Sequence, residues 1–212
     1  MNEFLHIYKK GGAQYESLAF DYLVGDLLIK DIRGEDKSRE LTALNMEKNM
    51  PTDFTPAMFY TFLYLSNNSE NINGKKFKDN VPLIYVFTSD ATNVTGLNFN
   101  LIPNDVRAAI LDIIVELTKN PMYDDTGNFK FNKTLSNLFI LKDGITSFLK
   151  YVKQKTGLDV SNAVRIYSIK YIKKSRLIEY DMWKYIPFLN FKDAVRGVGL
   201  ADLQSDIIKS NR

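Results

Sequence analysis

The chain has 212 residues, of which 45% are hydrophobic, 13% aromatic and 25% charged, a composition typical of an ordinary globular protein. It has no cysteine and a single histidine, His6, which excludes a disulfide framework, a thiolate nucleophile, a cysteine-ligated metal and a histidine-rich metal site. The formal net charge of +3 does not by itself indicate a partner.

Residues 1–50 are expected to form a helical arm or hairpin. The spacing of one helix face recurs at Tyr15, Leu18, Ala19, Tyr22 and Leu23. A second short helix around Leu44 can be capped by Ser38 or Asp36. Pro51 then ends the arm, because proline disfavours helical conformation in the residue before it. We expect neither a signal peptide nor a membrane span, since the apolar runs of the chain are too short.

Residues 51–190 are expected to form an α+β core domain, with a small antiparallel sheet packed against two or more amphipathic helices. The aromatic segment Met58–Tyr64 predicts a first strand, and the continuously apolar Pro82–Phe87 predicts a second strand that is buried on both faces. Residues 66–80 between them are polar and predict a long loop or hairpin. The segment Val94–Ile102 predicts a third strand. One face of that strand is expected to carry Val94, Leu97, Phe99 and Leu101.

Two strong amphipathic helices follow these strands. The first begins at Pro103, and its apolar stripe consists of Val106, Ala109, Ile110, Ile113, Ile114 and Leu117. Arg107 is expected on the opposite, polar face of this helix. The second is predicted as one continuous helix over residues 135–155, which Gly157 ends. Its inward side is expected to carry Leu138, Leu141, Ile145, Phe148, Leu149 and Val152.

The C-terminal part of the chain has weaker patterns. Residues 160–172 fit either a helix or a strand. Residues 180–191 contain Trp183 and Pro187 and are expected to form an irregular docking segment. Residues 191–212 are expected to form a C-terminal tail with short helices.

The sequence predicts no catalytic or metal-binding constellation. The tripeptide Asp-Thr-Gly at 125–127 matches that of aspartic proteases, but turn residues precede it where that chemistry needs an apolar strand. Asp124 and Asp125 could hold Ca²⁺ or Mg²⁺, yet no further carboxylate lies at loop spacing. We therefore expect that the protein is not an enzyme and needs no cofactor or metal.

The charge is distributed very unevenly along the chain. Residues 1–128 hold 12 basic and 18 acidic side chains, residues 129–176 hold 11 and 2, and residues 177–212 hold 5 of each. The basic segment also contains tyrosines, so it predicts a surface for phosphates or an acidic protein partner, with a merely solvated face as the alternative. Lysine outnumbers arginine 21 to 7, which favours backbone contact over base reading. The candidate contact residues are Lys130, Lys133, Lys142, Lys150, Lys153, Lys170, Lys173, Lys174 and Arg176.

Several segments follow one another in an order that resembles a known group of proteins. They are Met58–Tyr64, Pro82–Val86, Gly96–Pro103 with Arg107 and Leu111, Arg165–Tyr167, Lys170–Ile172, and Trp183 with Pro187 and Phe188. Over residues 56–190 this series resembles small virion proteins of tailed bacteriophages, of the neck or tail-completion, DNA-end-protector type. Asn100 and Leu101 stand where that family has a His-Tyr pair. The composition suits a crAss-like or similar AT-rich phage.

The resemblance implies a structural protein of the virion, assembled in the bacterial host cytoplasm. It would be a subunit of a multimeric ring at the neck, the portal–tail junction or the tail. Its partners would be other copies of itself and portal, neck or tail proteins, with DNA backbone as a further partner and no membrane. An acidic N-terminal part and a basic later part could meet head to tail between copies, which is the contact type that closes rings.

Two other hypotheses remain open at this point. The first is a sequence-independent DNA-binding protein that protects DNA ends with residues 129–176. The second is a hydrolase that uses Asp124 or Asp125.

Overall fold

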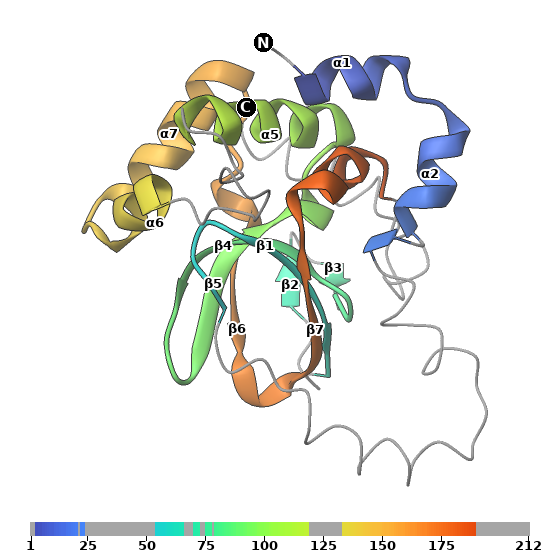
Figure 1. Ribbon diagram of the computed structural model, residues 1–212. Helices are drawn as coiled ribbons and strands as arrows, with labels where there is room; N and C mark the ends of the chain where they lie inside the picture. Colours follow the sequence, from blue (N-terminus) through green and yellow to red (C-terminus); the bar gives the residue numbers. More distant parts are fainter. Residues whose placement is uncertain are drawn as a thin grey trace, which may run out of the picture.

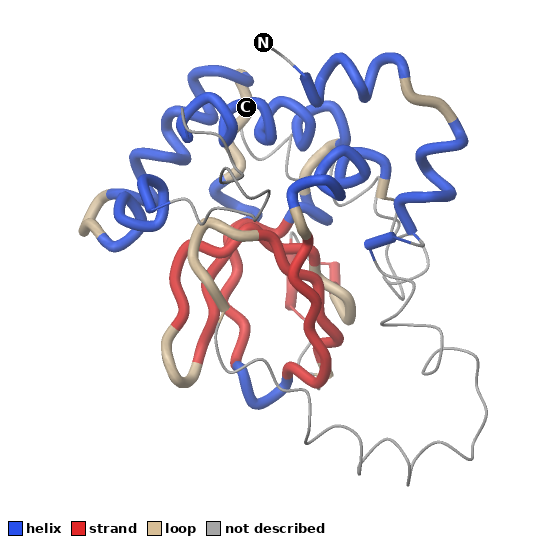
Figure 2. Tube along the Cα trace, in the orientation of Figure 1, coloured by secondary structure: helices blue, strands red, loops and turns tan. Residues whose placement is uncertain are grey.

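The computed structural model describes residues 3–20, 22–23, 54–65, 70–72, 75–77, 79–118 and 133–189. In these residues a layer of helices covers one side of a coiled, five-stranded antiparallel sheet (Figures 1 and 2). This is the α+β architecture that the sequence predicts. The described helices include none long and apolar enough to cross a membrane.

The sheet contains the three predicted strands and two more. In spatial order its strands are β6 (Val164–Ser168), β5 (Asn93–Asn98), β4 (Leu83–Ser89), β1 (Phe59–Tyr64) and β7 (Ile172–Ile178). All neighbouring strands are antiparallel. The ambiguous segment 160–172 forms a strand between two 3₁₀ turns, η3 (Ser161–Ala163) and η4 (Ile169–Tyr171). A separate hairpin, β2 (Glu70–Ile72) and β3 (Lys75–Phe77), lies within the segment expected as a loop or hairpin.

The two edge strands force the sheet to coil. β6 and β7 are at opposite edges, yet only the three residues of η4 connect them. A flat sheet would separate its edges by about 19 Å, whereas the chain from Ser168 to Ile172 spans at most about 15 Å. The edges therefore converge at η4 (Figure 1), where the N–H of Leu65 donates to the carbonyl oxygen of Tyr171 over 2.9 Å.

Both faces of this coiled sheet are apolar, because successive side chains of a strand alternate between faces. One face packs against the helices through Phe59, Leu83, Tyr85, Phe87 and Leu97. The other face encloses a second cluster that contains Phe54, Met58, Tyr60, Phe62, Ile84, Val86, Val94, Tyr167 and Ile172. The continuous apolarity of β4 thus corresponds to burial on both faces, as predicted.

The third strand is shorter than predicted. It ends at Asn98, and the chain continues as a 3₁₀ turn, η2 (Phe99–Leu101). The prediction of one shared apolar face was wrong, because Val94 and Leu97 are three residues apart and belong to the two different clusters.

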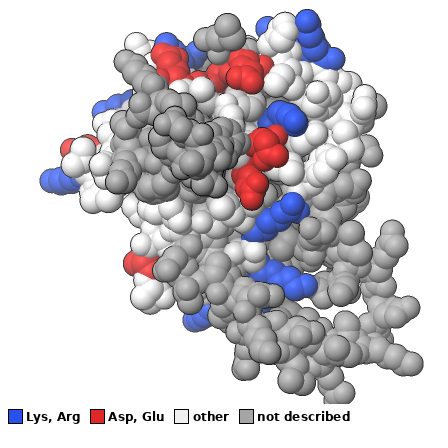
Figure 3. Space-filling view, in the orientation of Figure 1, with Lys and Arg blue, Asp and Glu red and all other residues white. Residues whose placement is uncertain are grey.

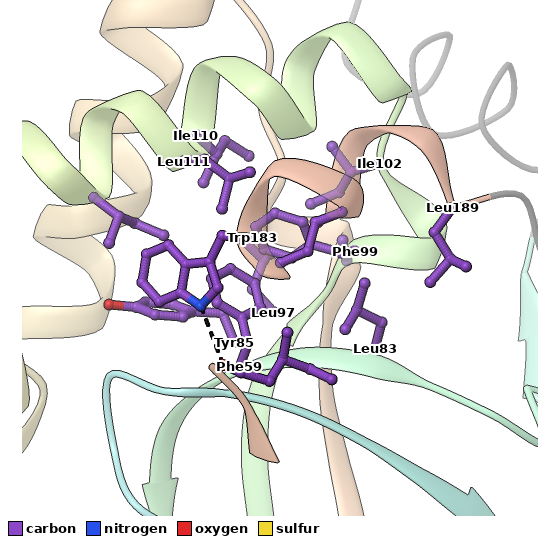
Figure 4. Packing of buried hydrophobic residues seen from close by; sticks show 14 of the residues in the cluster. Phe59, Leu83, Tyr85, Leu97, Phe99, Ile102, Ile110, Leu111, Trp183 and Leu189 are labelled. Carbon is purple, nitrogen blue, oxygen red and sulfur yellow. Dashed lines mark hydrogen bonds between the residues drawn. The ribbon is translucent and has the colours of Figure 1, made fainter. Parts of the chain in front are cut away.

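Helix α5 (Asn104–Thr118) follows Pro103, as predicted, and lies across the sheet. The segment with Trp183, expected to be irregular, is a 3₁₀ helix, η5 (Tyr180–Phe188). Figure 4 shows Trp183 between Leu111 of α5 and Phe59 of β1, with its indole N–H donating to the Ile178 carbonyl oxygen over 3.2 Å. The buried indole therefore fixes η5 between the helix layer and the sheet.

The predicted continuous helix over residues 135–155 was wrong. It is divided into α6 (Lys133–Ile140) and α7 (Gly144–Thr156) by a tight corner. In one straight helix Phe139 and Phe148 would point in opposite directions, because nine residues make two and a half turns. The corner lets both rings, 5.5 Å apart, pack on Phe87, and it leaves Leu141 64% exposed and not inward as expected. Gly157 ends α7, as predicted, with a φ of +74°.

Gly144 is required at this corner. A Cβ atom at this position would overlap the carbonyl oxygen of Leu138, so the two helices would have to separate. We expect Gly144→Ala to lower the free energy of unfolding by about 2–3 kcal/mol in urea titrations followed by circular dichroism. Gly12→Ala is the matched control, since a Cβ there meets nothing within 4 Å. Equal stability of the two variants would contradict this role of Gly144.

The described N-terminal residues share the main core. Helices α1 (Glu3–Lys10) and α2 (Ala13–Phe20) pack on α5 and η5, and Phe4 is buried. The Asp112 carboxylate of α5 accepts hydrogen bonds from the N–H groups of Phe4 and Leu5, over 2.9 and 3.1 Å. This carboxylate therefore caps the first turn of α1. Residues 24–50 of the expected arm and residues 191–212 of the expected tail lie outside the described residues.

Candidate partner-binding surface

The fold distributes the predicted basic residues over two separate regions. Lys142, Lys150 and Lys153 lie along the α6–α7 corner and α7, in the helix layer. A second set, which we call the β7 edge, lies in the sheet and consists of Lys170 of η4 and Lys173, Lys174 and Arg176 of β7. Lys133 is the first residue of α6, and Lys130 lies outside the described residues. On the face seen in Figure 3, basic side chains lie in separate places with acidic ones among them.

Two lysines of the helix layer bind acidic groups of their own chain. The Lys153 ammonium lies 3.1 Å from the Asp159 carboxylate, whose pKa is lowered to about 2, mainly by hydrogen bonds from Ser161. The Lys155 ammonium lies 3.4 Å from Glu116, and the Tyr151 hydroxyl donates to the same carboxylate over 3.0 Å. These contacts lower the pKa of Glu116 and join α7 to α5. Much of the positive charge of α7 is thus used within the protein.

Three residues of the β7 edge, Lys173, Lys174 and Arg176, lie on a strand with a single partner in the sheet, β1. Lys174 stands opposite Leu63 and Arg176 opposite Thr61, with a register irregularity beside Lys173. Lysines on an edge strand prevent unwanted pairing with other strands, and they can equally contact phosphates. The opposite edge strand, β6, instead presents an apolar side chain to solvent, because its Ile166 is 65% exposed.

The segment Gly96–Pro103, which carries the resemblance, builds a buried polar cluster. The Asp79 carboxylate accepts hydrogen bonds from Nδ2 of Asn98 over 2.7 Å and from Nδ2 of Asn100 over 3.1 Å. Nδ2 of Asn98 also donates to the Tyr167 hydroxyl over 2.8 Å, and its Oδ1 accepts from the backbone N–H of Asn100. This cluster therefore joins β5, η2, β6 and the residues before β4.

Arg107 is fully buried, contrary to its predicted place on the polar face of α5. Its Nε donates to the Ile102 carbonyl oxygen over 2.8 Å, and its Nη1 donates to that of Leu189 over 2.7 Å. Weaker contacts reach the carbonyl oxygens of Ile186 and Asn100. Burial lowers the pKa of the guanidinium to about 9, so the group is charged at neutral pH. The spacing of Arg107 to the buried Leu111 could have indicated this, since residues four apart share one helix face.

Two buried tyrosines on opposite faces of the sheet differ in the hydrogen bonding of their hydroxyl groups. The Tyr85 hydroxyl has no hydrogen-bond partner among the described residues, and burial raises its pKa. The Tyr167 hydroxyl accepts from Asn98. We expect Tyr85→Phe to leave the free energy of unfolding unchanged or raise it by about 1 kcal/mol, and Tyr167→Phe to lower it by about 1 kcal/mol. Urea titrations test this pair, and effects of the same sign would contradict the assignment.

The described part of the chain brings no three His, Cys, Asp or Glu side chains together as a metal site. Asp124 and Asp125 lie outside the described residues. Comparison with protein-family models, curated proteins and solved structures finds no match to this chain. A proposal for the role of this chain therefore depends on its sequence motifs and on the contacts and surfaces described above.

Proposed function

We propose that this chain is a structural protein of a tailed-bacteriophage virion, one subunit of a multimeric ring at the neck, the portal–tail junction or the tail. It would act by assembly with its own copies and with portal, neck or tail proteins, and not by catalysis. The observation that carries the proposal is the ordered series of motifs. Its first three segments and Arg107 come together in one unit of the fold, because β1, β4 and β5 pair in the sheet and Arg107 of α5 donates to the Ile102 carbonyl oxygen just after η2.

Assembly with the phage's own proteins tests this function. The purified chain, alone and mixed with portal and tail proteins of the same genome, is measured by mass photometry, and purified particles are analysed by mass spectrometry. We expect complexes that contain several copies of the chain, and the chain itself in the particles. A monomer mass in every mixture together with absence from the particles would overturn the proposal.

A second candidate function is contact with DNA backbone. The observation that favours it is the β7 edge, where four basic residues lie within seven positions of the chain. Such binding is expected to weaken by about tenfold or more between about 50 and 200 mM salt, because each phosphate contact releases counterions.

Two triple variants separate this function from a nonspecific charge effect. Lys173→Gln, Lys174→Gln and Arg176→Gln together should reduce DNA affinity in fluorescence anisotropy and flatten its salt dependence. The control combines Lys142→Gln, Lys150→Gln and Lys153→Gln, in the helix layer. It should retain both the DNA affinity and its salt dependence. Absent binding, or equal losses in the two triple variants, would remove DNA contact at the β7 edge.

A further inference from the structure

We propose that the corner between α6 and α7 docks on the α2–η5 surface of a second copy, in a head-to-tail contact. We define the corner as Ile140–Asp143, and the aromatic face as Tyr15, Tyr22 and Tyr185 with Glu16 and Lys184. This contact would supply the interface of the proposed ring, and its biological role rests on that proposed function.

The corner exposes two adjacent large apolar side chains. Ile140 is 72% exposed and Leu141 is 64% exposed, because Phe139 is the residue that faces the core. Hydrogen bonds from the N–H of Leu141 to Leu138 and from the N–H of Gly144 to Leu141, 3.1 and 3.0 Å long, close the turn. The turn thus holds the backbone of two neighbouring exposed apolar residues, and contiguous apolar surface marks interaction sites, whereas singly exposed apolar side chains are ordinary.

The aromatic face has the chemistry to receive these side chains. The rings of Tyr22 and Tyr185 are 4.9 Å apart, and those of Tyr15 and Tyr185 are 5.8 Å apart. The rings of Tyr15 and Phe188 stack with their centres 5.0 Å apart, which holds Tyr15 against η5. Tyr22 remains 39% exposed. Rings held in place in this way supply contact area with little loss of conformational entropy on binding, and tyrosine is enriched in the residues that dominate interfaces.

The position and charge of the two surfaces favour a second copy as the partner. The corner and α2 lie on opposite flanks of the helix layer (Figure 1), so copies related head to tail bring them together. The corner carries Lys142 and Asp143, both exposed. The aromatic face carries the exposed Glu16, and the Lys184 ammonium lies 5.2 Å from the centre of the Tyr185 ring. Each surface thus offers one acid and one base, and docking can pair opposite charges at both.

Cross-linking tests this contact directly, because the chain has no native cysteine. Two single-cysteine proteins, Lys142→Cys and Glu16→Cys, are mixed and treated with a short bis-maleimide. We expect covalent dimers in the mixture and few in either protein alone, because a head-to-tail contact keeps identical residues apart. Ile166→Cys mixed with Glu16→Cys is the control, since Ile166 is similarly exposed but lies on β6.

A second measurement tests the apolar pair itself. Ile140→Ser and Leu141→Ser are added together to the Lys142→Cys protein, and the dimer yield with Glu16→Cys is expected to fall by about tenfold or more. Ile166→Ser added in their place should leave the yield unchanged. All these sites are exposed, so circular dichroism should show every variant folded.

The outcomes distinguish this contact from the proposed function. Three outcomes would overturn the head-to-tail contact. They are absence of the mixed dimer, equal dimer yields in the mixture and in the single proteins, and an equal effect on the yield of Ile140→Ser with Leu141→Ser and of Ile166→Ser. The assembly test with portal and tail proteins would still stand in that case. A mixed dimer that depends on Ile140 and Leu141, from a chain absent in phage particles, would support the contact and remove the virion role.

Discussion

Replacement of Arg107 by methionine is expected to lower the free energy of unfolding by about 3–5 kcal/mol. Methionine fills a similar volume, but it cannot donate the hydrogen bonds that Arg107 gives to the buried carbonyl oxygens of Ile102 and Leu189. Loss of one partner of a buried hydrogen bond costs more than loss of both, because the remaining group has been removed from water. Urea titration followed by circular dichroism measures the effect.

The control for this prediction is Lys150→Met on α7, which removes an exposed cation. We expect a change of less than about 1 kcal/mol for this surface substitution. If the Arg107 and Lys150 variants unfold at the same urea concentration, Arg107 does not join α5 to η5 in the way the contacts indicate.

Asn98→Leu is expected to lower the free energy of unfolding by about 3 kcal/mol, because it breaks three buried hydrogen bonds at once. The substitution preserves volume, but the Asp79 carboxylate and the Tyr167 hydroxyl both lose the amide that donates to them. The same urea titration measures this loss.

Asn93→Leu, in the same strand but only partly buried, is the matched control and should change stability by less than about 1 kcal/mol. Similar losses from the two asparagine variants would show that the polar cluster is not what stabilises β5 and η2.

The sequence predicts those parts of this fold that depend on neighbouring residues. The three central strands, the start of α5 after Pro103 and the end of α7 at Gly157 follow from alternation, helix periodicity and glycine chemistry. The break between α6 and α7 does not follow from the local pattern, because a stripe of apolar residues continues through it. The two phenylalanines that must both reach Phe87 determine the corner.

The contacts of the polar side chains are harder to predict from the sequence, because they join residues far apart in the chain. Asp79 meets Asn98 across 19 positions, Arg107 meets Leu189 across 82, and Asp112 meets Phe4 across 108. Residues 129–176 form one basic block in the sequence, yet the topology places part of that block on α7 and part on the β7 edge. The distribution of charge along the sequence therefore does not predict which basic residues share a surface.

The coiled sheet has a consequence for the order in which the protein can be completed. β6, η4 and β7 form one continuous segment, Val164–Ile178, that supplies both outer strands of the sheet. Until the ribosome has made this segment, β5 and β1 each lack a neighbour on one side, and unpaired strands of this kind are sites of aggregation. A single late addition then supplies the missing partners of β5 and β1 together, so the nascent chain completes both sides of its sheet in one step.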